Sequence, residues 1–382
     1  MKRSILALSI GTFALGIAEF VVMGILSNLA DDFHITDSQA GHIISAYALG
    51  VSIGAPVLLF FRKYRLKSIL LFLTAMMIAG NVLTALSPNY AVILVARLIS
   101  GLPHGAYFGV GAIMARNLAD KGHEAMAVSM MVAGMTIATT IGVPTGTFLC
   151  DTVSWRLTFV IVAVAALTAF IMIRKYVPGQ APLPSANFTS QFLFLKKGAP
   201  WLIFAGVFFG QTGIYCWYSY IDPLMQNVAG FSSGAMTWIM TVAGLGMFAG
   251  TMISGRLADR YNPARVTSLI ALFSIGVLTA TYFLADIRWA VIPLTFLGTA
   301  GLFGIGGPLQ SLIVKYSRGG EMLGAAGIQI SFNVGNAIAA LIGGAAISSG
   351  LGYNSTALIG IPLVIISVAA LVTLYRHYER QR

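Results

Sequence analysis

Long apolar stretches separated by short polar connections run through this chain from end to end. A helix needs about 20 apolar residues to cross the ~30 Å hydrocarbon core of a bilayer, and the sequence contains twelve such stretches. They predict an all-α polytopic membrane protein, because β-barrel spans would be alternating segments of about 10 residues. The predicted spans are 4–29, 40–61, 67–86, 90–115, 125–149, 155–175, 199–221, 233–254, 265–285, 289–313, 323–347 and 354–376.

One connection is longer than the rest and divides the twelve spans into two sets of six. It covers residues 177–197 and contains Pro178, Pro182 and Pro184. We therefore predict an N-terminal six-helix bundle over 1–176, a cytoplasmic linker over 177–197 and a C-terminal six-helix bundle over 198–382.

The composition excludes several classes of protein. Of the 382 residues, 57% are hydrophobic and only 9% are charged, whereas about a quarter of the residues in a soluble domain are charged. The net charge is +11, but Lys and Arg are too sparse for a nucleic-acid surface. Cys150 and Cys216 lie in different apolar stretches, so their spacing indicates neither a disulfide framework nor a metal cluster.

The basic residues predict which side of the membrane each connection occupies. Lys and Arg stay on the cytoplasmic side. With both termini inside, 20 basic residues fall inside and two, Arg156 and Arg288, fall outside. We therefore expect a multi-pass protein of the bacterial cytoplasmic (inner) membrane with both termini in the cytoplasm. A cleaved signal peptide is disfavoured, because the first stretch is long and contains Glu19.

The two halves resemble each other at an offset of about 197 residues. Tyr64 matches Tyr261, and Glu124 matches Glu321. Two interpretations stay open, chance similarity between glycine-rich helices or a true repeat. Two six-span halves repeated in parallel are a transporter architecture, with a site at their interface that is exposed alternately to each side.

Small residues recur every four positions in several spans. Such residues let helices approach closely where lipid supplies no hydrophobic driving force. Prolines at 103 and 144 and the Gly306-Gly307-Pro308 stretch should bend their helices. The pattern fits ordinary tight packing or helices that slide during transport. The candidate packing and gating residues are Gly101, Gly105, Gly142, Pro144 and Gly146.

Glu19 and Arg97 are the one acid and the one strong base predicted inside the hydrocarbon zone. A charge there costs about 2.5–3.5 kcal/mol on insertion scales, so each should face a cavity or the other. At 1.5 Å per residue they lie roughly 15 and 10 Å below the outer surface, which allows a direct or water-bridged pair. Either Glu19 carries a coupling proton, or the two form a static pair that pins their helices together.

His104 follows Arg97 by seven residues and therefore lies on the same helical face. Two roles stay open for it. It relays a proton, since histidine titrates near neutrality, or it is a neutral histidine bonded to a neighbouring helix.

Amide, hydroxyl and aromatic side chains recur at helical spacing in the later spans. In a membrane such groups bind helices to each other or line a cavity that suits a neutral polyol or an amphipathic organic molecule. The candidates for the cavity are Tyr47, Tyr107, Gln211, Tyr215, Tyr218, Gln310, Gln329, Asn333 and Asn336.

The sequence contains no Gly-x-x-x-x-Gly-Lys-Ser/Thr loop and no catalytic motif. We therefore expect neither a nucleotide-driven pump nor an enzyme, and no cofactor or metal. Transport would then draw on an ion gradient, with protons as the expected ion, or be passive.

The chain resembles the drug:proton antiporter group of the major facilitator superfamily along essentially its whole length. The segments that carry the resemblance are GTF at 11–13, AEF at 18–20, RLISGLPHGA at 97–106, GVPTGT at 142–147, PWLIFA at 200–205 and GGEMLGAAG at 319–327. The 142–147 segment is similar to the antiporter motif that the exporters carry. Arg97 occupies the position of the family's span 4 arginine, which assists proton transfer.

The resemblance implies proton-coupled efflux of sugars or drug-like amphipathic compounds by alternating access. The expected partners are a small-molecule substrate, protons and membrane lipid, with the protein acting as a monomer. A sugar or nucleoside importer or facilitator and a non-transporting membrane sensor or scaffold are the alternatives.

The chain departs from the family at one motif. The family's loop between spans 2 and 3 usually carries an aspartate that takes part in a cytoplasmic charge latch. The second-half copy, GRLADR at 255–260, keeps the aspartate as Asp259 beside Arg260, whereas the first copy, FFRKYR at 60–65, lacks it. The expected latch is therefore incomplete in the first half.

Overall fold

The computed structural model describes residues 2–57, 64–120, 124–180 and 189–380, and within these ranges the chain is helical and has no strand. This confirms the predicted all-α class. The helices of the first half are α1 Lys2–Phe20, α2 Leu26–Phe33, α3 Asp37–Val57, α4 Leu66–Ala85, α5 Tyr90–Leu118, α6 Glu124–Ile137, α7 Val143–Thr152 and α8 Trp155–Tyr176.

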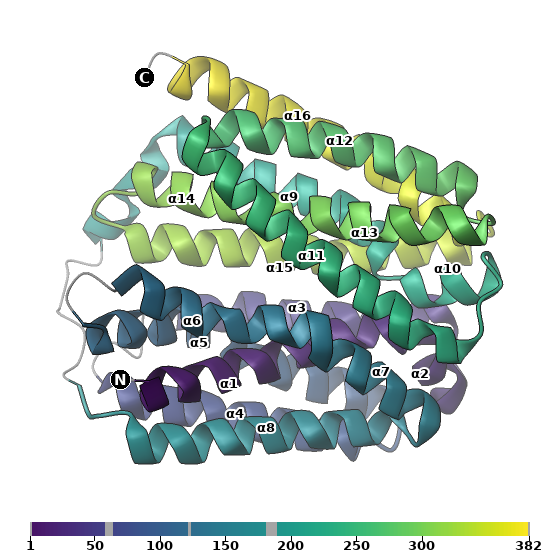
Figure 1. The fold of residues 1–382 in the computed structure, drawn as a ribbon, viewed down its shortest axis with the longest axis horizontal. Helices are drawn as coiled ribbons and strands as arrows, with labels where there is room; N and C mark the ends of the chain where they lie inside the picture. The colour runs from purple at the N-terminus through teal and green to yellow at the C-terminus, as the bar shows by residue number, and fades with distance from the viewer. Residues whose placement is uncertain (1, 58–63, 121–123, 181–188, 381–382) are drawn as a thin grey trace.

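The second half repeats this order of helices. Its members are α9 Gly198–Tyr218, α10 Ile221–Asn227, α11 Met236–Arg260, α12 Pro263–Leu284, α13 Arg288–Gly304, α14 Gly306–Tyr316, α15 Glu321–Ser348 and α16 Ser355–Leu374. Figure 1 shows α1–α8 gathered in the lower half of the molecule and α9–α16 in the upper half, with all long helices running roughly along one axis.

The described chain contains eleven segments that are long and apolar enough to cross a membrane. Each corresponds to one predicted span. The remaining predicted span, 40–61, corresponds to α3, and its last residues fall in 58–63, outside the described residues. The helices therefore follow the twelve-span pattern that the sequence predicts.

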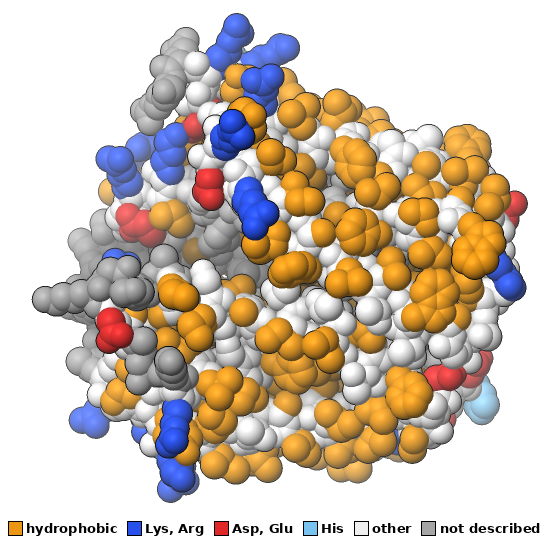
Figure 2. Space-filling view, in the orientation of Figure 1, with side chains coloured by type: hydrophobic (Ala, Val, Ile, Leu, Met, Phe, Trp, Pro, Cys, Tyr) orange, Lys and Arg blue, Asp and Glu red, His pale blue; other side chains and the backbone are white. Residues whose placement is uncertain are grey.

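The charged side chains sort to opposite ends of the helix axis. Both termini lie at the left end in Figure 1, and Figure 2 shows most of the basic side chains on this face at the same end, with apolar side chains covering the middle. We call this the basic end and the other the far end. Basic residues at the basic end include Arg174, Lys175, Arg256, Arg260, Lys315 and Arg376, and acidic residues at the far end include Asp31, Asp32, Asp37, Asp151 and Asp286.

Several spans are interrupted rather than continuous. The predicted 4–29 span is α1, a 3₁₀ turn over Val21–Gly24, and α2. The predicted 289–313 span breaks between α13 and α14, where Gly306, Gly307 and Pro308 weaken the helix. A π-helical turn, Ala138–Gly142, precedes Pro144, as is common where a proline removes a backbone hydrogen bond. Across Pro103, in contrast, α5 continues as one helix.

The structure favours a true repeat over chance similarity. Pro263 opens α12 197 residues after Leu66 opens α4, and Glu321 opens α15 197 residues after Glu124 opens α6. The breaks also correspond, since α1 and α9 are each followed by a short helix. The halves meet through equivalent pairs as well, because α3 packs against α15, and α11 packs against α7.

Glycines set the close helix crossings within each half. On α3, Gly50 and Gly54 face the carbonyls of Leu98 and Leu102 on α5. The equivalent α11 glycines, at 246 and 250, face carbonyls on α13. From the α5 side, a Cβ on Gly101 would overlap the Tyr47 carbonyl, so the α3–α5 crossing depends on glycine at this position.

The other predicted packing residues also lie at helix contacts. A Cβ on Gly105 would lie 2.8 Å from the Ala55 side chain, and one on Gly142 would lie 2.6 Å from Ile17. A Cβ on Gly146 would lie 2.8 Å from Thr158 and Val21. Ordinary tight packing therefore accounts for these glycines in the state that the structure describes.

We predict that Gly101→Ala destabilises the protein by about 1–3 kcal/mol, because overpacking at the α3–α5 crossing forces the helices apart. Gly276→Ala is the control, since no atom lies within 4 Å of its added Cβ and alanine favours helix. Thermal unfolding of the purified variants measures both effects. Equal melting temperatures for the two variants would contradict the prediction.

Candidate functional site

Glu19 lies near the end of α1 with its carboxylate buried and without a hydrogen-bond partner. The residue is 2% exposed, and neither carboxylate oxygen accepts a hydrogen bond. An ionisable neighbour is His104 on α5, whose Nε2 lies 3.7 Å from Oε2. Burying a carboxylate without hydrogen-bond donors costs free energy of folding. A contribution to stability therefore does not explain an acid at position 19.

Arg97 on α5 is also buried without a polar partner. It is 0% exposed, and none of its three side-chain nitrogens has a hydrogen-bond acceptor. Its guanidinium stacks instead on two aromatic rings, 4.2 Å from the Tyr47 centroid and 5.5 Å from the Phe159 centroid. The cation is thus held by ring faces, and Glu19 interacts with it electrostatically without a direct ion pair.

Tyr47 on α3 connects the side chains of Arg97 and His104 on α5. Its hydroxyl lies 2.9 Å from His104 Nδ1, and its ring forms the face on which Arg97 stacks. The imidazole is further fixed by Phe108, which stacks on it at 5.3 Å. The structure therefore brings together the three predicted proton-coupling residues, with Tyr47 among them.

The second half presents tyrosines to this cluster. Tyr215 and Tyr218 on α9 are buried, and both interact electrostatically with Glu19. Their rings meet edge to face at 6.1 Å, and Tyr215 also packs against Phe332 of α15 at 5.5 Å. Glu19 therefore lies where the first half faces the second.

Several buried polar atoms of α9 and α15 have no partner among the described residues. Gln211 donates from Nε2 to the Leu302 carbonyl at 3.3 Å, but its Oε1 accepts nothing. The Tyr215 hydroxyl and the side-chain oxygens of Asn333 and Asn336 are likewise unpaired. Buried polar groups are normally hydrogen-bonded, so these atoms are available to a bound molecule or to water.

The remaining predicted cavity residues lie elsewhere. Tyr107 is buried, and its hydroxyl donates to the Leu8 carbonyl at 3.2 Å, so it joins α5 to α1. Gln310 on α14 and Gln329 on α15 are half-buried. Asp259 and Arg260 are exposed at the basic end of α11. The first copy of the latch motif falls largely within 58–63, outside the described residues.

The far end is sealed by hydrogen bonds between the halves. Asp222 on α10 is fully buried, and its Oδ2 accepts from the Ser27 backbone N–H on α2 at 2.7 Å. At a second contact between the halves, the Ser45 hydroxyl donates to the Ala337 carbonyl at 2.8 Å, which joins α3 to α15. Gln226 completes the site by donating to Asp222 Oδ1 at 2.6 Å.

A third contact of the seal joins two residues outside the spans. The Tyr353 hydroxyl donates to the Asp37 carboxylate across the halves. Burial and this hydrogen bond raise the pKa of the Tyr353 phenol. The phenol therefore remains a proton donor to Asp37 at neutral and moderately alkaline pH.

Burial along the two central helices is continuous at the far end. Every residue from 14 to 26 of the first half is buried, and so is every residue from 210 to 225 of the second. The described state is thus closed at the far end.

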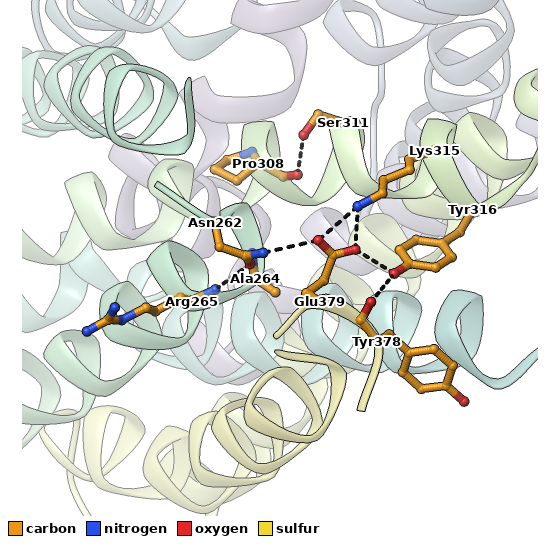
Figure 3. Close-up of polar contacts among 9 residues, drawn as sticks. All are labelled: Asn262, Ala264, Arg265, Pro308, Ser311, Lys315, Tyr316, Tyr378 and Glu379. Carbon is orange, nitrogen blue, oxygen red and sulfur yellow. Dashed lines mark hydrogen bonds and ion pairs between the residues drawn. The ribbon is translucent and has the colours of Figure 1, made fainter. Parts of the chain in front are cut away.

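A separate charged cluster fastens the end of α16 at the basic end. Figure 3 shows Lys315, Tyr316 and Asn262 pointing toward the Glu379 carboxylate. Lys315 Nζ lies 2.7 Å from Oε1, the Tyr316 hydroxyl donates to the same oxygen at 2.5 Å, and Asn262 donates to Oε2 at 3.1 Å. The cluster joins the chain end to α14 and to the start of α12, all within the second half.

Sequence reasoning missed the roles of Asp222 and Glu379. Both appear in the sequence as acids near span ends, and nothing in their spacing indicates that Asp222 binds a backbone N–H of the other half. The contact of Tyr47 with His104 was also not predicted. Each depends on which helices become neighbours.

Comparison with known proteins gives consistent matches. The Major Facilitator Superfamily profile matches residues 8–328. The chain is 44% identical over 385 residues to a protein of Escherichia coli (strain K12) named AraJ, covering 100% of this chain and 97% of that protein. It is also 30% identical over 378 residues to the E. coli (strain K12) inner membrane transport protein YdhP, covering 99% and 96%.

Solved structures share the fold at low sequence identity. A bacterial homolog of the human lysosomal transporter Spinster, in an inward-facing and occupied conformation, gives a TM-score of 0.76 at 16% identity and covers 99% of this chain and 97% of its own. A D-xylose-proton symporter gives 0.75 at 14% identity, covering 98% and 97%.

We predict that Asp222→Ala opens the far end more often, because the Ser27 N–H loses its buried acceptor. A loss of about 1.4 kcal/mol would raise the opened population tenfold. Cys150 reports on it, since its thiol is buried and lies within electrostatic range of Asp222. In a Cys216→Ser background, maleimide labelling of Cys150 should become faster.

Asp222→Asn is the matched control for this measurement. It keeps an oxygen acceptor for Ser27 and should label nearly as slowly as the parent. Equal labelling rates in all three proteins would show that this hydrogen bond does not hold the far end closed.

Proposed function

Because the chain belongs to the major facilitator superfamily, we propose that it is a proton-coupled exporter of small organic molecules, sugars or drug-like amphipathic compounds. Members of this family are membrane transporters and not enzymes, and the chain carries the membrane-spanning helices of one. The proposal adds the direction, the energy source and the class of cargo. A proton gradient is the proposed energy source, with the protein working as a monomer.

The observation that carries the proposal is the unpartnered Glu19 carboxylate. Burial removes its hydration, while Arg97 nearby favours the charged form. Its affinity for a proton therefore depends on water access and on its distance from this cation. Both quantities change when the halves move, so Glu19 can bind a proton in one state and release it in the other.

The geometry argues against the static-pair interpretation of Glu19 and Arg97. A pair that served only to hold α1 against α5 would be in direct contact, since a buried charge is tolerated when it is paired and hydrogen-bonded. Here the two interact only at longer range, and Arg97 stacks on rings instead. Two charged groups without a direct ion pair suit a site whose contacts change during a transport cycle.

Unpaired amide and hydroxyl oxygens on α9 and α15 support an uncharged, hydroxyl-bearing or amphipathic cargo. They lie among aromatic rings such as Phe332, and such mixed linings orient small molecules by a few polar contacts. Export over import is supported by the 142–147 segment, which is similar to the exporters' motif. We propose that the halves 1–176 and 198–382 move as two bodies about this site.

Transport in proteoliposomes tests the proposal, with D-xylose and ethidium as probes and an imposed pH gradient. We expect gradient-dependent movement of at least one probe by the unmodified protein. Glu19→Gln should reduce that movement to the level of protein-free vesicles, because an amide cannot carry the proton.

Glu321→Gln is the matched control, because Glu321 is exposed at the start of α15 and far from the predicted coupling residues in sequence. It should keep the gradient dependence. If Glu19→Gln transports with an unchanged dependence on the gradient, Glu19 is not the proton carrier.

A further inference from the structure

Tyr47 lies at one of the close approaches of α3 and α5. The glycine at 101 faces the Tyr47 carbonyl without room for a Cβ, so the two backbones are in direct contact here. Arg97 and His104 lie one turn before and one turn after this glycine on α5. The tight crossing therefore places one phenol within reach of both side chains.

The two ends of the Tyr47 side chain make different contacts. Its ring face holds the Arg97 guanidinium at 4.2 Å, and its hydroxyl lies 2.9 Å from His104 Nδ1. The whole residue is 1% exposed. An aromatic ring without the hydroxyl could still hold Arg97, so the two contacts can be separated by substitution.

The hydroxyl contact decides which nitrogen of His104 carries the proton. A neutral imidazole has one donor and one acceptor nitrogen. Nε2 lies 3.7 Å from Glu19 Oε2, which is too far for a hydrogen bond, but an N–H dipole directed at an ionised carboxylate is favoured over a lone pair directed at it. We therefore assign the hydrogen to Nε2, which leaves Nδ1 to accept from the Tyr47 hydroxyl.

We propose that Tyr47 is the positioning residue of the proton site, fixing His104 as the Nε2–H tautomer that faces Glu19. The inference rests on the proposed function for its role in coupling, but the tautomer itself does not. When Glu19 takes up a proton on Oε1, Oε2 still presents its lone pairs to the Nε2–H group 3.7 Å away. No proton has to pass through Tyr47.

The groups that face this site come from four helices. Glu19 is on α1, Arg97 and His104 are on α5, and the phenols of Tyr215 and Tyr218 on α9 interact electrostatically with Glu19. On α8, Phe159 contributes only a ring face to Arg97. Glu19 is thus the one acidic side chain at this site among the described residues.

NMR of the ¹⁵N-histidine-labelled full-length protein tests the inference without a transport substrate. The chain has five histidines, and the signal lost in His104→Asn belongs to His104. In the unmodified protein we expect the Nε2–H tautomer, with a step in its shifts that follows Glu19 ionisation and is absent in Glu19→Gln.

Tyr47→Phe keeps the ring for Arg97 and removes the hydroxyl. We expect mixed His104 tautomers and an altered step, because Nδ1 loses the hydrogen-bond donor that keeps the hydrogen on Nε2. Tyr107→Phe is the matched control, since its hydroxyl bonds the Leu8 carbonyl, and it should keep the parent tautomer and step.

Two outcomes would overturn the inference. One is an Nδ1–H tautomer in the unmodified protein, which requires no variant to fold. The other is a Tyr47→Phe spectrum and step that coincide with the parent. Failure of the proposed function looks different, because gradient-driven transport would then survive Glu19→Gln in proteoliposomes while the His104 tautomer still depended on Tyr47.

Discussion

Polar groups inside a bilayer must find partners within the protein, because hydrocarbon offers none. Most of this chain meets the constraint locally. The hydroxyls of Thr74, Thr84 and Thr281 each donate to a carbonyl of their own helix four residues earlier. The exceptions include Glu19, Arg97 and the amides of α9 and α15, and also Asn81 and Ser100 within the first half. Of these, Glu19 and the α9 and α15 amides lie on helices that alternating access would rearrange.

The packing and the site depend on each other at the α3–α5 crossing. Glycine on α5 lets the backbone of Tyr47 approach, and the same approach brings its phenol to His104 and its ring to Arg97. A looser crossing would separate these groups even if every polar residue were kept. The repeated crossing between α11 and α13 has the same glycine spacing, but Leu294 stands 197 residues after Arg97.

The helices and the positions of Glu19 and Arg97 could be predicted because hydropathy and depth are properties of single segments. The contacts between helices could not. Whether Tyr47 lines a cavity or bonds His104 depends on the distance between two helix axes, and Asp222 meets Ser27 only because α10 lies against α2. The break between α13 and α14 was visible as Gly306-Gly307-Pro308, whereas the continuity of α5 across Pro103 was not.

Two of the three contacts that close the far end use main-chain groups as partners. Asp222 binds a peptide N–H, and Ser45 binds a peptide carbonyl. Water can take over each of these contacts as the halves separate, because a solvated peptide group and a solvated carboxylate are both well hydrated. Parting this end therefore exchanges one set of hydrogen bonds for another, and a latch made in this way closes and reopens without leaving any buried charge stranded.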